Sequence, residues 1–541
     1  MDVEAAAETE VLIAGAGPVG LALALELQRS GIRLRIVEKK AERSTTSKAL
    51  GLQPRLSEVF AILGIAGDFF ARGFGGVRAL NLRSGSKKLL TIILRFSPNL
   101  AGRDAFQPRF IMIPQSVTEE ILETTLAERG HAVERRRELV GFSQDRDAVS
   151  VLIREEDGAE ETIRAKFLVS CEGAHSLVRK QAGFTFTGAT FPLRTLLADV
   201  TIDWDLPENE VHTWFHRDGA FAALPFGGQK WRLVAECAQD PRNAAPEVTL
   251  EQMQDLMVRR TGKEDARVRD PIWLSDFRIN ARMVDRFRER RVFVAGDAAH
   301  IHSPAGGQGI ATGIQDAANL AWKLAAFLRE GAPDSLLNTY DEERKPIARE
   351  VLQRTSAVTA IIFAMNPIAG FVRERLLVPV LRWPLVQRRM FAKLSQLEMS
   401  YRGRSLSVHV DTPFSRTRVR GGDRAPDVVF EKAGETVSLF QLIRRSGMIA
   451  LLGPGEQAEE IAIKLATLHI LAFIVSLDCA AASVGGNLQD KYGDFARLYG
   501  AQGPFLYLIR PDGHVGLFQR RVDAGSLAAY LKKVRGPNFE L

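Results

Sequence analysis

The chain has 541 residues, of which 46% are hydrophobic and 25% charged, as in ordinary globular proteins. This length exceeds what a single hydrophobic core supports, so several domains are expected. The 72 basic and 65 acidic side chains leave a net charge of only +7, and no recognition motif accompanies it, which argues against nucleic-acid binding.

Cysteine spacing and hydropathy bear on the compartment. Cys171, Cys237 and Cys479 are far apart and form neither a C-x-x-C motif nor the spacing of a zinc site. The N-terminus lacks the basic and apolar regions of a signal peptide, and no run of about 18 uncharged apolar residues predicts a membrane span. We therefore expect a cytoplasmic protein without a metal site or an integral membrane segment.

The first predicted element is a strand–turn–helix–strand unit. An apolar strand at residues 11–14 runs into the glycine turn at residues 15–20. An Ala- and Leu-rich helix follows to about Ser30, and a second strand at residues 34–37 ends at Glu38. This order places G-x-G-x-x-G in the context that a dinucleotide site requires, so the unit predicts binding of an adenine dinucleotide.

Four residues of this unit have separate expected roles. Gly15 permits the tight turn, Gly17 lets a pyrophosphate approach the backbone, and Gly20 lets the helix and strand pack closely. Glu38 would accept hydrogen bonds from a ribose diol.

The next segments alternate strands and helices. A strand at residues 110–115 is followed by a helix from Ser116, with Glu119 as its predicted capping partner in the pattern S-x-x-E. Strands at residues 149–153 and 167–170 then lead to the run Cys-Glu-Gly-Ala-His-Ser-Leu-Val-Arg.

The pattern changes between residues 185 and 280. Strands separated by turn-prone Asp, Gly and Pro are predicted at residues 196–202, 211–216, 220–225 and 231–236. They predict an antiparallel sheet whose aromatic surface comes from Trp214, Phe215, Phe221, Phe226 and Trp231.

Residues 291–328 combine a strand, a turn, a glycine-rich loop and a long helix. The strand ends at Gly296-Asp297, a position from which Asp297 can grip the hydroxyl groups of a ligand. The loop from Pro304 to Gly309 lets backbone N–H groups approach a planar ligand, and the helix N-terminus that follows favours negative charge.

The last third of the chain contains two further regions. Basic, apolar helices at residues 355–400 could cover a cleft, pair with another subunit or touch a membrane surface, and packing is favoured. A new unit begins near Gly421, with strands at residues 449–452, 471–476 and 505–509.

On these motifs the sequence resembles the class A flavin-dependent monooxygenases of the para-hydroxybenzoate hydroxylase type, over about residues 9–350. Their FAD-ribityl motif Gly-Asp is matched by Gly296-Asp297, and their A-A-H-x-x-x-P-x-G-G-Q-G by residues 298–309. Their fingerprint Asp-Gly-x-x-Ser-x-x-Arg is matched from Glu172 to Arg179, with Glu in place of Asp. Ile310-Ala311 stands where the family commonly has Met-Asn.

The resemblance implies a set of FAD contacts that includes basic residues in the loop after Glu38 and a glutamine near the ribityl chain. The expected cofactor-binding residues are Gly15, Gly17, Pro18, Val19, Gly20, Glu38, Lys39, Arg43, Lys48, Gln115, Glu172, Gly173, Arg179, Gly296, Asp297, Pro304, Gly307, Gln308, Gly309, Ile310 and Ala311.

The resemblance also implies the reaction. NAD(P)H would reduce the bound FAD, and a flavin C4a-hydroperoxide formed with O₂ would hydroxylate an apolar aromatic, phenolic or polyketide-like substrate. The backbone of Pro304, Gly306 and Gly307 would line the reactive face. No tyrosine precedes Tyr340, so a base on the predicted sheet would have to be a histidine, His212 or His216, and neither is favoured over activation by substrate and backbone.

Two alternatives stay open from the sequence. A Baeyer–Villiger oxygenase on the same scaffold would carry the same motifs. The departures at Glu172 and Ala311 would also suit a flavin- or ligand-binding protein that no longer turns over.

The expected fold is α/β. It comprises a Rossmann-like FAD-binding domain at residues 1–184 and 281–354, an inserted antiparallel-sheet substrate domain at residues 185–280, and a helical segment at residues 355–415. Residues 416–541 resemble the thioredoxin-like domain appended to phenol and aromatic-polyketide hydroxylases, without its C-x-x-C. A structural or subunit-contact role is expected for this domain, and a homodimer is possible.

Overall fold

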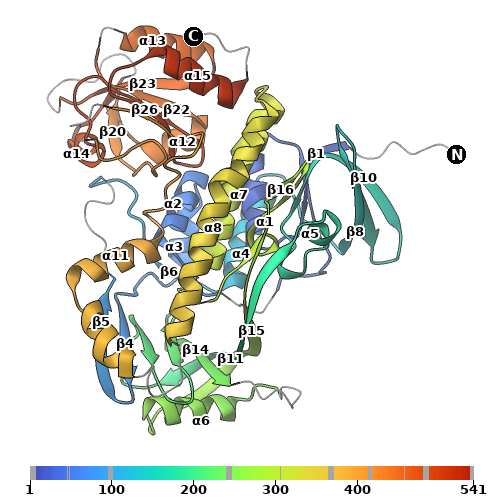
Figure 1. Ribbon diagram of the computed structural model, residues 1–541, viewed down its shortest axis with the longest axis vertical. Coiled ribbons are helices and arrows are strands. Elements are labelled where there is room, and N and C mark those ends of the chain that lie inside the picture. Colours follow the sequence, from blue (N-terminus) through green and yellow to red (C-terminus); the bar gives the residue numbers. More distant parts are fainter. Residues whose placement is uncertain are drawn as a thin grey trace.

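Three eight-stranded β-sheets organise the described part of the chain (Figure 1). In Figure 1 the first sheet lies at the right, the second at the bottom and the third at the upper left. The computed structural model describes residues 8–44, 47, 49–94, 102–238, 247–304, 306–362, 371–411, 417–455, 457–478 and 487–536.

The first sheet carries the N-terminal unit. In parallel, β1 (Glu8–Ala14) pairs with β2 (Leu34–Glu38) and β10 (Glu160–Ser170), and β10 pairs with β17 (Val292–Val294). Apart from the partly buried Leu34, the apolar side chains of these strands are almost fully buried, as expected of parallel strands under helices. The remaining strands are β7 (Glu134–Arg135), β8 (Arg137–Gln144), β9 (Val149–Glu155) and β16 (Arg288–Glu289).

Three helices pack together beside this sheet. Helix α1 (Pro18–Arg29) contacts both α4 (Gln115–Glu128) and α7 (Gly309–Arg329). Near them lie α2 (Pro54–Leu63), α3 (Ala66–Arg72), and the short pair of strands β3 (Gly51–Leu52) and β6 (Ile111–Met112). The strands and the helix predicted for the N-terminal unit are confirmed, with ends shifted by a few residues.

The predicted capping box of α4 is wrong. The helix begins at Gln115 rather than Ser116. Its N-cap is Pro114, whose side chain has no oxygen to accept a hydrogen bond from the first turn. The backbone N–H of Gln115 donates to Ser47 Oγ at 2.8 Å, and Glu119 Oε1 accepts from Gln115 Nε2 at 2.8 Å. The Glu119 carboxylate therefore holds a side chain instead of the helix backbone.

The second sheet has the order β18-β15-β11-β14-β13-β12-β4-β5. The strands predicted between residues 196 and 236 are confirmed. The hairpin of β4 and β5 extends the sheet because β4 pairs in parallel with β12, although the sequence assigned this hairpin to the FAD-binding domain. The strands are β18 (His300–Ile301), β15 (Arg267–Val284), β11 (Phe186–Asp203), β14 (Lys230–Ala238), β13 (Phe221–Pro225), β12 (Glu210–Trp214), β4 (Ala79–Ser84) and β5 (Lys87–Ile93).

Helix α6 (Leu250–Thr261) covers one face of the second sheet. Trp214, Phe221 and Trp231, one from each of three neighbouring strands, pack with α6 in one buried cluster. Their neighbours in sequence point to the opposite face, because successive side chains of a strand alternate. Val211 and Leu224 on that opposite face pack against Leu50 and Met112 of the first domain and against Phe74, Val77, Leu94 and Phe226.

The third sheet belongs to the C-terminal unit, and the strands predicted there are confirmed. Strand β19 pairs with β26, although the sequence placed residues 355–415 in a helical segment. In spatial order the strands are β19 (Val408–Val410), β26 (Val515–Gln519), β25 (Leu506–Ile509), β22 (Ile449–Leu452), β23 (Leu471–Ser476), β24 (Leu488–Gln489), β20 (Val429–Lys432) and β21 (Glu435–Ser438). The helices are α12 (Leu439–Ser446), α13 (Ala458–Thr467), α14 (Asp494–Tyr499) and α15 (Ala524–Arg535).

Helix α8 (Asp334–Ile362) runs lengthwise through the middle of the view in Figure 1, from the level of the C-terminal unit to the second sheet. It is followed by η3 (Arg373–Leu377), α10 (Val378–Leu381) and α11 (Pro384–Ser395), of which α10 packs against β5. Within the described ranges, no helix combines the length and the apolar character needed to cross a membrane.

The cluster under α6 should dominate the stability of the second sheet. Trp231 is fully buried there, so Trp231→Ala should lower the free energy of unfolding by about 3–5 kcal/mol through lost burial and a residual cavity. Denaturant unfolding followed by circular dichroism measures this loss. Ile272→Ala on β15 is the matched control, because its side chain is 58% exposed, and it should cost less than about 0.5 kcal/mol. Equal losses would contradict the assignment.

Candidate functional site

The glycine turn between β1 and α1 has two closed positions and one open position. A Cβ on Gly15, whose φ is +101°, would lie 2.5 Å from the carbonyl oxygen of Cys171, and a Cβ on Gly20 would lie 2.0 Å from that of Gly15. A Cβ on Gly17 would meet nothing within 4 Å. The turn is therefore packed on its protein side and open at Gly17, which fits the approach of a pyrophosphate.

A close contact joins this turn to the Gly-Asp motif. A Cβ on Gly296 would lie 2.8 Å from Val19 Cγ2, and a Cβ on Gly313 would lie 2.7 Å from the same methyl carbon and 3.0 Å from Gly296 Cα. The start of α1, the turn η2 (Gly296–Ala298) and α7 can approach this closely only because both positions lack a side chain. Sequence reasoning singled out Val19 and Gly296 but missed Gly313, since one glycine in a small-residue helix gives no sign of a contact.

Two carboxylates lie at the ends of parallel strands of the first sheet. Asp297 is exposed, although the residues on both sides of it are buried. Glu38 accepts hydrogen bonds from the backbone N–H of Ala16 at 3.0 Å and of Lys40 at 3.1 Å, so it lies against the glycine turn. Lys39 is exposed. A ribose-binding carboxylate beside a pyrophosphate-binding turn would have this arrangement.

The glycine-rich loop is held by a side chain that sequence reasoning missed. Gln53 Nε2 donates to the carbonyl oxygens of Gly306 at 2.9 Å and of Gly307 at 2.7 Å. Both glycines have positive φ, +86° and +61°, and both are exposed, as is Pro304. At Gly306 and Gly307 the loop thus exposes backbone without a side chain. Nothing in the local pattern GLQPR announces this long-range contact.

The loop leads into the N-terminus of α7, where the first backbone N–H groups of a helix lack intrahelical partners. Gly309, Ile310 and Ala311 occupy this first turn. The side chain of Gln308 instead turns toward α8, where its Oε1 accepts from Arg354 Nη2 at 2.7 Å. The backbone of this turn is therefore suited to hydrogen-bond acceptors of a ligand.

Asp316 of α7 holds the Gly-Asp turn from behind. Its carboxylate accepts from the backbone N–H of Gly296 at 3.2 Å, from Arg344 Nε at 2.7 Å, and lies 2.6 Å from His300 Nε2. Burial acts to raise the pKa of Asp316, but His300 and Arg344 outweigh it and hold the pKa below its usual range. An acid inside an otherwise small and apolar helix was the sequence signal that could have pointed to this residue.

The segment from Glu172 to Arg179 is held mainly by contacts within itself, and Arg179 joins it to the Gly-Asp turn. Glu172 accepts hydrogen bonds from Ser170 Oγ at 2.8 Å, from Ser176 Oγ at 2.7 Å and from two backbone N–H groups of α5 (Leu177–Gln181), at 3.3 and 3.1 Å. Arg179 is buried and donates to the carbonyl oxygens of Ala298 and Ala174. The longer carboxylate thus caps a helix, and Arg179 stabilises the loop rather than being exposed to a phosphate.

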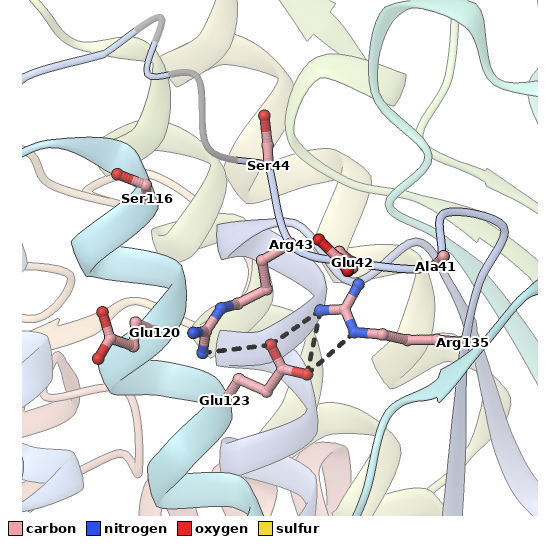
Figure 2. A pocket seen from close by; sticks show the side chains of 8 residues that line it. All are labelled: Ala41, Glu42, Arg43, Ser44, Ser116, Glu120, Glu123 and Arg135. Atoms are coloured by element: carbon pink, nitrogen blue, oxygen red, sulfur yellow. Dashed lines mark hydrogen bonds and ion pairs between the residues drawn. The ribbon is translucent and has the colours of Figure 1, made fainter. Parts of the chain in front are cut away.

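The loop after Glu38 borders a polar pocket of about 600 Å³. Figure 2 shows Arg43 and Arg135 converging on Glu123, at 3.8 Å and 2.8 Å from its Oε2. Gln115 lies at the start of the same helix, α4. Lys48, which was expected in this region, lies outside the described residues. The pocket lining, from the loop, α4 and β7, is Ala41, Glu42, Arg43, Ser44, Ser116, Glu120, Glu123 and Arg135.

Neither histidine considered as a base is placed near the glycine-rich loop that ends at Gly309. His212 is fully buried beside Trp214 and Trp231, on the face of the second sheet that α6 covers. His216 interacts with Asp218 at a turn. The alternation of side chains along β12 explains the position of His212, since Val211 rather than His212 points toward Leu50 and Met112. Over the described residues, no group of three or more His, Cys, Asp or Glu side chains is placed to hold a metal ion.

The contact between Val19, Gly296 and Gly313 generates a prediction. Gly313→Ala should reduce the FAD content of the purified protein at least several-fold, because the new methyl group would push α7 away from both motifs. The ratio of flavin to protein absorbance measures this. Val19→Ala removes the opposing methyl groups but not the close approach to Gly296 Cα, so the double variant should regain part of the FAD. Gly67→Ala, at an open position of α3, should keep the wild-type FAD content.

A second prediction concerns His212. Burial, reinforced by Arg83, lowers the pKa of His212 to about 4, so between pH 6.5 and about 4 a proton binds the unfolded chain in preference to the folded one. Stability should therefore be lost as the pH falls through this window, by up to about 3 kcal/mol from this residue. Denaturant unfolding of His212→Asn should show a flatter dependence on pH, while a variant of the exposed His175 should match the wild type.

Comparisons with known proteins agree with this geometry. A family model described as FAD binding domain matches residues 8–355. A flavin-dependent monooxygenase of Mycobacteroides abscessus is 38% identical over 522 residues, which cover 94% of this chain and 96% of that protein. The 6-methylpretetramide 4-monooxygenase of Streptomyces rimosus is 37% identical over 400 residues, 72% of this chain and 70% of that protein.

A solved structure shares the whole architecture. OxyS anhydrotetracycline hydroxylase from Streptomyces rimosus has a TM-score of 0.78 and 30% identity, and the match covers 98% of this chain and 99% of that one. The mixed α/β fold, the open glycine turn and the matched family model support the same assignment. The chain belongs to the FAD-binding family of flavin-dependent monooxygenases and is an enzyme of that class.

Proposed function

We propose that the protein hydroxylates an aromatic ring of an apolar, multi-ring substrate, with NAD(P)H and O₂ as co-substrates. The observation that carries the proposal is the apolar cluster between the second sheet and the first domain. In this cluster Val211 and Leu224 of the sheet meet Leu50 and Met112. Gln53, which directly follows β3, donates to the carbonyl oxygens of Gly306 and Gly307 in the glycine-rich loop. The relatives named for 6-methylpretetramide and anhydrotetracycline act on substrates of this class.

The proposed FAD site uses the geometry described above. The open backbone at Gly17 receives the pyrophosphate, and the carboxylates of Glu38 and Asp297 accept hydrogen bonds from the hydroxyl groups of the ribose and the ribityl chain. The first turn of α7 and the exposed backbone of Gly306 and Gly307 face the ring system. When bound, FAD accepts a hydride from NAD(P)H and activates O₂ for transfer of one oxygen atom.

The other residues expected to bind FAD have different roles in the proposed site. Pro18, Val19 and Gly20 shape the turn, and Gly173 and Pro304 lie in the loops around it. Arg43 lies on the pocket of Figure 2, paired with Glu123. Glu172 and Arg179 support these loops through the hydrogen bonds that they already make, and we assign them no direct contact with FAD.

This chain's own task is positioning and the exclusion of water. An apolar sheet face over an exposed backbone loop keeps a reactive oxygen species away from solvent. Neither positioning nor the exclusion of water needs a side-chain nucleophile. The phenol group of such a substrate can itself supply the electron density that makes the ring reactive. A Baeyer–Villiger reaction on the same scaffold is the competing outcome, and no contact among the described residues favours it.

The finer points of organisation are proposals as well. A thioredoxin-like identity for the C-terminal unit is supported by the parallel pair β22–β23 beside the antiparallel strands β25 and β26. The absence of C-x-x-C from the sequence makes its role structural. We propose a homodimer because the helical segment exposes the apolar side chains of Leu376, Trp383 and Leu385. A cytoplasmic location is a separate proposal. Light scattering tests the dimer.

The reaction itself gives a direct test. Purified protein supplied with FAD, NADPH or NADH, and a polycyclic phenol should consume O₂ and return a product 16 mass units heavier, or 18 mass units heavier when the gas is ¹⁸O₂. A new phenolic carbon in the NMR spectrum supports hydroxylation, whereas an ester or lactone carbon would establish Baeyer–Villiger chemistry instead. Asp297→Ala should lose FAD and activity together, and exposed Ile272→Ala should keep both.

A further inference from the structure

A turn of the C-terminal unit is buried against the helices of the FAD-binding domain. Arg510 and Asp512 lie between β25 and β26, in the sequence Arg-Pro-Asp-Gly-His. The guanidinium of Arg510 donates to both carboxylate oxygens of Glu343 on α8, at 2.6 and 3.0 Å, and to both of Asp512, at 3.1 and 2.5 Å. Arg510 is fully buried and Glu343 is 1% exposed, so this is an interior ion-pair cluster.

Helix α7 completes the cluster. Lys323 Nζ donates to Glu343 at 2.7 Å, and Asn319 Nδ2 donates to Glu343 at 2.8 Å and to Asp512 at 3.2 Å. The two cations Arg510 and Lys323 balance the two carboxylates. Removing one member leaves an uncompensated charge in the interior, so the turn is strongly tied to α7 and α8.

The cluster connects with the Gly-Asp turn through buried contacts. The guanidinium of Arg510 lies 5.1 Å above the ring of Tyr401, whose hydroxyl accepts from Arg344 Nη1 at 3.1 Å. Arg344, next to Glu343 on α8, also donates to Asp316 at 2.7 Å, and Asp316 in turn binds the backbone N–H of Gly296 at 3.2 Å. The side chains along this route are each only 0–2% exposed, namely Arg510, Tyr401, Arg344 and Asp316.

Helix geometry explains why α7 transmits this contact. Asp316, Asn319 and Lys323 are spaced three and four residues apart, which places them on one face of the helix. That face therefore meets the C-terminal turn at one end and the Gly-Asp turn at the other. The same helix begins at the glycine loop, so a shift of α7 displaces both parts of the site.

We propose that Arg510 is a positioning residue for the FAD site, fixing α7 and the Gly-Asp turn through Tyr401, Arg344 and Asp316. The C-terminal unit then sets the affinity for FAD without supplying a side chain to the glycine turn or the glycine loop. This inference rests on the proposed FAD site.

The test compares FAD affinity in the full-length chain, measured by quenching of flavin fluorescence on titration of the apoprotein. Arg510→Met should raise the Kd for FAD by roughly tenfold or more, which corresponds to about 1.4 kcal/mol. Arg510→Lys keeps the charge but not the fork, so it should restore part of the affinity.

The matched control breaks another contact between the same units. Arg535 of α15 pairs with Glu330, at the far end of α7 from the glycine loop. Arg535→Gln should lower the thermal unfolding midpoint of the apoprotein but leave the Kd for FAD within about twofold of the wild type. An equal loss of affinity in Arg510→Met and Arg535→Gln would mean that loosened docking alone is responsible, and would overturn the positioning role.

A double-mutant cycle tests the route. Arg510→Met and Asp316→Asn should together weaken FAD binding by clearly less than the product of their separate effects, because they act on one chain of contacts. Multiplicative effects would overturn the proposal. Should Arg510→Met not fold, Tyr401→Phe takes its place in the cycle, since it removes only the hydroxyl that accepts from Arg344. A wild-type protein that does not bind FAD would instead refute the proposed site itself.

Discussion

The buried carboxylate of Asp316 makes the contact on which the rest of the site depends. Its three partners come from different parts of the chain: the backbone of Gly296 from the Gly-Asp turn, His300 from an edge strand of the second sheet, and Arg344 from α8. A carboxylate without access to water is tolerated only when its partners compensate for the lost hydration. The turn, the sheet and the helix must therefore be in place together, which makes the site cooperative rather than a sum of separate motifs.

The second sheet is tied to the glycine-rich loop by the short segment that contains His300. His300 and Ile301 pair with Met283 and Arg282 of β15, and the chain then continues directly into the glycine-rich loop. A displacement of the sheet would thus move the residues that precede Pro304. The second sheet and the glycine-rich loop are consequently adjacent parts of one structure.

Local patterns allowed the glycine turn, its acidic end and the Gly-Asp strand to be predicted, because their roles follow from backbone geometry within a few residues. Contacts between distant segments left no such trace. Gln53 holds a loop about 250 positions further along the chain, and the hairpin of β4 and β5 joins a sheet whose other strands begin at residue 186. The capping box failed because Pro114, not Ser116, precedes the helix. His212 was considered as a base because its residue type suits the task, whereas the alternation of β12 decides which face it occupies.

Shifted pKa values are a common pointer to catalytic acids and bases, but here they lead away from the site. Burial lowers the pKa of Lys323 to about 8 and that of His212 to about 4, yet Lys323 belongs to an ion-pair cluster and His212 to an aromatic core. The proposed fit to FAD depends instead on Gly17 and Gly313, which carry no titratable group. In an enzyme whose chemistry belongs to a bound cofactor, empty space beside the backbone is the stronger sign of function, since the protein's contribution is to admit and orient the group that reacts.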